Sequence, residues 1–176
     1  MKRIFLLALI LSFATRLGFA QPKCEYQYPY YDDEPELILQ EGMMEWYFSN
    51  DNGERIGGYY KEARPFYHGL AAVRDMMGWT FINLSGERIC SYYEEVTDFI
   101  EGYALVKDMM GWQFIDKSGK RIGYYYEKAY PYYRGRALVK DMMGWYLVDK
   151  AGRRITEYHD SPEEIQQGYR RPHYPY

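Results

Sequence analysis

The chain has 176 residues, of which 47% are hydrophobic and 19% aromatic, and it contains 22 tyrosines. Its formal net charge is −3, and its basic residues are scattered singly or in short pairs, which argues against a nucleic-acid partner. We therefore expect a folded protein in which aromatic rings supply much of the core.

The N-terminal segment 1–20 predicts a helical secretory signal peptide. Lys2 and Arg3 precede an apolar stretch over residues 4–14, and Gly18-Phe19-Ala20 has the small-x-small pattern of a cleavage site. The apolar stretch is too short to span a membrane, and no later segment is apolar enough, so we expect no stable membrane insertion of the mature chain. The expected location is the periplasm or the cell exterior.

Four tryptophans recur at one constant spacing along the chain, and their neighbours recur with them. They are Trp46, Trp79, Trp112 and Trp145. The last three end the pentapeptide Asp-Met-Met-Gly-Trp, whereas the first ends Gly-Met-Met-Glu-Trp. A glycine follows each Trp by seven residues, and an isoleucine follows it by ten. A fixed period of this length is typical of stacked structural repeats.

Each unit is expected to be a β-hairpin with a third strand. In the third unit, strands over 104–107 and 112–116 flank a four-residue turn, whose first Asp and last Gly suit a type I turn ending in a left-handed residue. The predicted hairpins cover 37–50, 70–83, 103–116 and 136–149. We predict an all-β fold of tandem repeats, arranged as an open curved sheet or a solenoid-like stack. A propeller-like ring is the alternative, although a blade usually needs four strands and a longer unit.

The repeats lie between two Tyr/Pro-rich segments. The predicted organisation is a signal peptide over 1–20, an N-terminal segment over 21–36, about 3.5 repeats over 37–156 and a C-terminal tail over 157–176. Such end segments are extended by default, and they could also cover the terminal repeats and shield the open sheet edges.

These motifs resemble the WG β-repeat family of bacterial proteins. The shared features are Gly-Trp before a strand that ends in Asp, the Gly seven residues after Trp, and a Gly-x-Ala-x-Val strand before the next Gly-Trp. The resemblance implies β-rich repeats, usually in exported or surface-associated proteins, and implies no catalytic residues. Glu45 departs from the pattern because it replaces Gly where a positive φ is expected, at about 1–2 kcal/mol if the turn is kept.

The tryptophans and the turn glycines Gly78, Gly111 and Gly144 are expected to be structural anchors. Burial of each indole would make it the core residue of its unit. The alternative is a row of exposed rings on which sugars stack.

Every methionine of the mature chain belongs to a pair at a hairpin tip, where polar residues are usual. Besides Met43-Met44, the pairs are Met76-Met77, Met109-Met110 and Met142-Met143. Three interpretations remain open: packing on the next unit's connector, an adaptable apolar patch for a protein partner, or a Cu(I) site made of thioethers. The last three pairs are our candidate binding residues.

Tyrosine pairs recur at one fixed place after each of the first three tryptophans. Neighbours on a strand point to opposite faces, so one ring of each pair should be outward. We take Tyr60, Tyr93 and Tyr126 as candidate binding residues, and the alternative is that the rings stack and lock the units. Positions that vary between units are further candidates for specificity. One such position holds His68, Glu101 and Arg134.

No catalytic set, metal site or cofactor motif is visible, so we predict that the protein is not an enzyme. Cys24 and Cys90 could form a disulfide outside the cytoplasm, or remain unpaired. The predicted function is an exported scaffold that presents an extended surface to a protein or an envelope polymer. The alternative is a glycan- or cell-wall-binding module that uses exposed aromatic rings.

Overall fold

The computed structural model describes residues 37–43 and 45–165, and among them it contains β-strands and one short 3₁₀-helix but no α-helix. The predicted signal peptide and N-terminal segment lie outside the described residues. The elements are β1 (Ile38–Glu41), β2 (Trp46–Ser49), β3 (Arg55–Tyr60), β4 (Glu62–Ala63), β5 (Leu70–Asp75), β6 (Gly78–Asn83), β7 (Glu95–Val96), β8 (Tyr103–Asp108), β9 (Gly111–Asp116), β10 (Arg121–Tyr126), β11 (Lys128–Ala129), β12 (Arg136–Asp141), β13 (Gly144–Asp149) and the 3₁₀-helix η1 (Pro162–Ile165).

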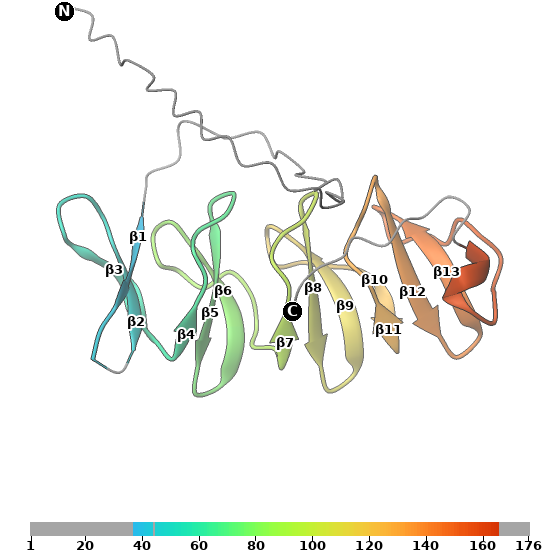
Figure 1. Ribbon diagram of the computed structural model, residues 1–176, viewed down its shortest axis with the longest axis horizontal. Helices are drawn as coiled ribbons and strands as arrows, with labels where there is room; N and C mark the ends of the chain where they lie inside the picture. Colours follow the sequence, from blue (N-terminus) through green and yellow to red (C-terminus); the bar gives the residue numbers. More distant parts are fainter. Residues whose placement is uncertain (1–36, 44, 166–176) are drawn as a thin grey trace, which may run out of the picture. The chain divides into compact units, whose positions relative to one another are not determined.

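The strands form four antiparallel sheets, which follow one another in chain order (Figure 1). Their strand orders are β1-β2-β3, β4-β5-β6, β7-β8-β9-β10 and β11-β12-β13. Each sheet is built on one hairpin: β1–β2, β5–β6, β8–β9 or β12–β13. The prediction of an all-β repeat fold with these four hairpins is confirmed.

The chain leaves each hairpin and returns along its second strand. As a result, each Trp pairs with a residue of the returning segment at the same place in its unit. The pairs are Trp46 with Tyr60, Trp79 with Tyr93, Trp112 with Tyr126 and Trp145 with His159. The returning segment is a full strand in the first and third units, as β3 and β10, and isolated bridges in the other two. The fourth unit therefore repeats the pairing with a histidine in place of the tyrosine.

The tip of the second hairpin requires glycine for two reasons. Gly78 has a φ of 128°, and a Cβ on it would lie 2.7 Å from the carbonyl oxygen of Tyr93. The Asp75 carboxylate accepts the backbone N–H of Met77 at 2.7 Å and so holds the turn. Gly111 and Gly144 have the same geometry in the next two units. The returning strand thus passes too close to the tip for any side chain.

The first tip differs, and it corrects the expectation for Glu45. Residues 42–45 form the loop, because Glu41 pairs with Trp46, whereas in the second unit Asp75 pairs with Gly78 and only two residues lie between them. The Gly42 N–H donates to the Glu45 carbonyl at 2.8 Å. The longer loop removes the left-handed position, so Glu45 does not bear the strain that the sequence comparison predicted.

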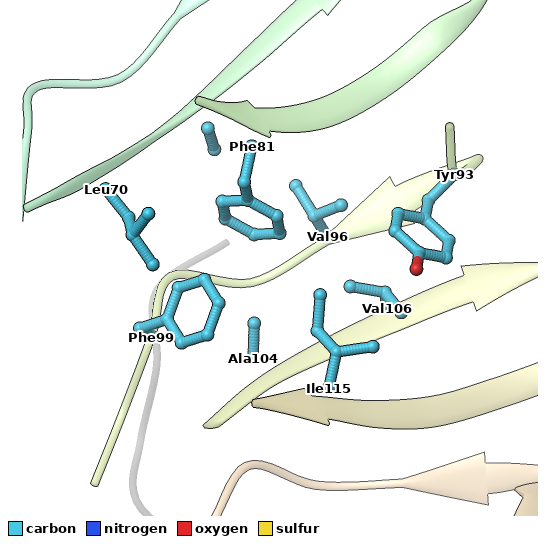
Figure 2. Packing of buried hydrophobic residues seen from close by; sticks show 9 residues of the cluster. Leu70, Phe81, Tyr93, Val96, Phe99, Ala104, Val106 and Ile115 are labelled. Carbon is cyan, nitrogen blue, oxygen red and sulfur yellow. The ribbon is translucent and has the colours of Figure 1, made fainter. Parts of the chain in front are cut away.

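Neighbouring sheets pack face to face, so the central strands are buried on both sides. Figure 2 shows Leu70 and Phe81 of the second sheet against Ala104, Val106 and Ile115 of the third, with Val96 of β7 and Phe99 of the following connector packed beside them. A corresponding cluster joins the third and fourth sheets. The core is therefore shared between units, as stacking repeats require.

The tryptophans are not the most deeply buried residues of their units. Three of the four are only partly buried, whereas Phe48, Phe81 and Phe114, two positions after Trp, are at most 1% exposed. Cations or rings cover the indoles: Arg64 lies 4.9 Å from the Trp79 ring, and Tyr130 stacks on Trp145. The expectation that each indole is a core anchor thus holds for the buried Trp145 and is corrected for the other three, whose indoles lie at the hairpin end near the tip.

The C-terminal end of the stack is covered by the chain itself. The outer face of the last sheet contains Leu138, Trp145 and Leu147, all buried, and Ile165 of η1 packs against this group. Within the expected C-terminal tail, residues 157–165 therefore lie on the last repeat. This arrangement covers apolar surface that a further repeat would otherwise bury.

Candidate functional site

The methionine tips are among the most exposed apolar groups of the described residues. Met76, Met109 and Met142 are 87–94% exposed, and their neighbours Met77, Met110 and Met143 are at least 70% exposed. Met43 of the first tip is fully exposed, and Met44 lies outside the described residues. These side chains do not pack on the next unit's connector, so that interpretation is wrong.

Hairpin geometry explains this exposure. The last paired residues are Asp75 with Gly78, so Met76 and Met77 lie beyond the sheet. Asp75, not either thioether, forms the hydrogen bond that holds the turn. In Figure 1 the tips of β5–β6, β8–β9 and β12–β13 point to the same side of the stack. The tips thus present pairs of flexible apolar side chains whose local fold does not depend on them.

The second tyrosine of each pair is buried, which corrects our choice of candidate binding residues. Tyr60, Tyr93 and Tyr126 are at most 8% exposed. Burial raises the pKa of Tyr93 to about 12 and also raises the pKa of Tyr126. The Tyr60 hydroxyl accepts the backbone N–H of Gly58 at 3.0 Å. These rings lock the returning strand into the core and offer no surface to a ligand.

The first tyrosine of each of the three pairs, and Tyr158 at the equivalent position of the fourth unit, has an arginine guanidinium over its ring. The distances from guanidinium carbon to ring centroid are 4.4 Å for Arg55–Tyr59, 4.7 Å for Arg88–Tyr92, 4.7 Å for Arg121–Tyr125 and 4.2 Å for Arg154–Tyr158. We call these four contacts the arginine–tyrosine pairs. We did not predict these contacts from the sequence, although an arginine stands nine residues after every Trp and recurs with the same period.

The variable positions proposed for specificity occupy a strained turn. His68, Glu101 and Arg134 are the only non-glycine residues with positive φ among the described residues, at 50–53°. Glu101 also links two sheets, because its carboxylate accepts the Gly135 N–H at 2.8 Å and lies 3.2 Å from Nζ of Lys150. These positions therefore have a structural role in at least one unit.

The described residues contain no group of three or more His, Cys, Asp or Glu side chains able to hold a metal ion. Cys90 is partly buried beside Thr80, with Sγ 3.6 Å from the hydroxyl, and burial raises the pKa of its thiol. Cys24 lies outside the described residues, so the disulfide stays a prediction. Within the same described ranges, no helix is long and apolar enough to cross a membrane.

Comparison with known families agrees with this geometry. The family model described as WG containing repeat matches residues 47–75 and 79–108. The chain contains WG repeats. The two matched WG repeats cover β2 to β8, and the same pentapeptide and hairpin recur around Trp112 and Trp145. The molecule is thus a β-repeat scaffold. No curated protein and no solved structure matches the chain at a significant level.

Proposed function

We propose that the chain is an exported, non-enzymatic scaffold whose methionine tips bind an apolar surface of a partner protein. The observation that carries this proposal is the exposure of at least 70% at all seven described tip methionines. Soluble proteins usually place polar residues in turns, and repeated exposed apolar groups are typical of interaction surfaces.

Methionine suits such a surface because its unbranched thioether adapts to irregular partner surfaces. Fully burying one methionine contributes about 1.5–3 kcal/mol. A partner that covered two neighbouring tips would bury four such side chains. This gain is large enough to offset a substantial part of the entropy lost on association, which is about 4–15 kcal/mol.

A glycan-binding function through aromatic rings has less support. Tyr60, Tyr93 and Tyr126 are buried, and an arginine lies over each first tyrosine of the pairs. Trp79 has Arg64 over its ring, and Lys107 lies 5.8 Å from the ring of Trp112. The rings that a neutral sugar would need for stacking are thus already in contact with protein groups.

Photo-methionine incorporation tests the proposal directly, because every methionine after the predicted signal peptide stands at a tip. We expect illumination of cells that carry the labelled chain to crosslink one partner through Met76-Met77 or Met109-Met110. The purified partner should then bind wild type, and it should bind the variant with these four residues changed to Ser at least tenfold more weakly.

Tyr124→Ser is the matched control, since Tyr124 is 74% exposed but belongs to the returning strand β10 and not to a tip. It should bind the partner with wild-type affinity. The methionine variant should also keep the wild-type melting temperature, because the removed side chains make few contacts. Equal affinity of wild type and the methionine variant for the purified partner would refute the proposal.

A further inference from the structure

The arginine–tyrosine pairs form a second repeated surface, separate from the methionine tips. Arg55, Arg88, Arg121 and Arg154 are all exposed. Each stands near the start of the returning segment, and the tyrosine beneath it comes four residues later, close to the hairpin tip. An arginine stacked on a ring has fewer conformations to lose when it binds a ligand.

These four guanidinium groups form no ion pair with a carboxylate among residues 37–43 and 45–165. Other cations on the same fold are paired: Arg64 with Asp98 at 2.9 Å, Lys140 with Glu127 at 3.0 Å and Lys150 with Glu101 at 3.2 Å. Arg153, directly before Arg154, is paired with Asp149. The arginines of the pairs therefore retain hydrogen-bonding capacity for an acidic ligand.

The distance between successive arginine–tyrosine pairs depends on how closely the backbones of neighbouring repeats approach. A Cβ on Gly86 would lie 2.5 Å from the Cα of Gly57, two residues after Arg55. A Cβ on Gly152 would likewise lie 2.5 Å from the Cα of Gly123, two residues after Arg121. The segments that carry Arg55 and Arg121 are thus held against the next repeat at equivalent glycines. Face-to-face sheets are about 10 Å apart, so the arginines recur at roughly this step.

We propose that the row of arginine–tyrosine pairs binds an acidic polysaccharide through its carboxylates. This site is independent of the methionine tips. A planar guanidinium binds a carboxylate through two parallel hydrogen bonds. Four equal sites at a constant step match a ligand that is itself periodic, which a folded protein surface is not.

The overall charge favours a sparsely charged polymer over a densely charged one. The chain has a net charge of −3, so a nucleic acid, with one phosphate charge for about every 1.7 Å of duplex, would be repelled by the rest of the molecule. A polyuronate with neutral sugars between its carboxylates places its charges farther apart. Such a polysaccharide can bind the four arginines without contacting the acidic parts of the protein surface.

Fluorescence anisotropy with labelled oligosaccharides of alternating uronate and neutral sugar tests the proposal. We expect affinity to rise with chain length until the oligosaccharide spans the four pairs, and to fall as salt is added. Arg88→Gln with Arg121→Gln should weaken binding about 25-fold, or about fivefold for each arginine. A neutral oligosaccharide of the same length should not bind.

The control variant is Lys128→Gln with Arg136→Gln, which removes the same charge from exposed residues that are not part of the arginine–tyrosine pairs. It should keep wild-type affinity. Equal weakening by the two double variants would mean that only net charge matters and would overturn the proposal. Tighter binding of poly-glutamate than of the oligosaccharide would also overturn it, because the ligand would then be an acidic peptide. Circular dichroism melts should show that both variants remain folded.

Discussion

Arg153 donates its Nε hydrogen to Oδ2 of Asp149 at 2.8 Å, across the turn that follows the last hairpin. In the first two units the same two positions hold Asn50 with Glu54 and Asn83 with Glu87, and there the amide donates to the carboxylate. The donor and the acceptor have exchanged places while the contact has remained. In all four units the first residue also accepts two backbone N–H groups of the turn.

This exchange predicts a compensating pair of substitutions. Glu87→Lys should remove the hydrogen bond from Asn83 and lower the free energy of unfolding by about 0.5 kcal/mol, as is usual for an exposed contact. Adding Asn83→Asp should restore the lost stability. An acidic residue would then face a basic one, as at these positions in the third and fourth units. A double-mutant cycle from urea unfolding measures the coupling, and a coupling of zero would show that the side chains act independently.

Gly111→Ala should be strongly destabilising. Gly111 has a φ of 122°, and a Cβ on it would lie 2.8 Å from the carbonyl oxygen of Tyr126, so the returning strand would have to move. We expect a loss of about 3 kcal/mol in urea unfolding. Gly102→Ala is the control: its φ is 92° but nothing lies within 4 Å, so only strain of about 1 kcal/mol applies. Similar losses for the two would contradict the close approach.

Phe114→Ala should cost more than Trp112→Ala, although tryptophan is the larger residue. Phe114 is completely buried between sheets, whereas Trp112 is partly buried and covered on one side by Lys107. We expect about 3–5 kcal/mol for Phe114 and about 2–3 kcal/mol for Trp112, by chemical denaturation. The reverse order would mean that the indole, not the phenyl ring, anchors the unit.

Glu45→Gly should not stabilise the protein. Glu45 lies in a loop two residues longer than the second tip and not at the paired position of Gly78, so glycine restores no turn there and adds freedom to the unfolded chain. The expected change in the free energy of unfolding is a loss of about 0.5 kcal/mol. A gain of about 1 kcal/mol or more in the same urea experiment would indicate that the first tip shares the turn of the other three.

Alkaline pH should unfold the protein through its buried tyrosines. Burial raises the pKa of Tyr93 from 10.0 to about 12 in the folded state. The neutral phenol is thus favoured by folding, so its contribution to stability is complete below pH 10 and is lost as pH rises through about 12. Tyr93→Phe should reduce this loss between pH 10 and 12, and unfolding followed at each pH by tryptophan fluorescence measures it. An unchanged pH profile would exclude Tyr93 as a contributor.

The repeat, the hairpins and their turns could all be predicted from the order of residues alone. Turn chemistry is local, so Asp75 and Gly78, or Asn83 and Gly86, specify it wherever the chain folds. The constant spacing of the tryptophans also indicated that the units stack, because one hairpin cannot bury its own apolar faces. Glu45 shows the limit of this reasoning, since a loop two residues longer removed the strain that alignment of the units predicted.

Which side chains are buried depends on contacts between strands and between units. Pairing between β9 and β10 shifts register between Ile122 and Tyr126, where Gly123 has a φ of 74°. That irregularity breaks the simple alternation, so the tyrosine pairs could not be assigned to faces from their order in the chain. The exposure of the methionines and the stacking of Arg121 on Tyr125 also depend on where the returning strand and the next sheet lie. Those positions follow from contacts between units, which no single repeat contains.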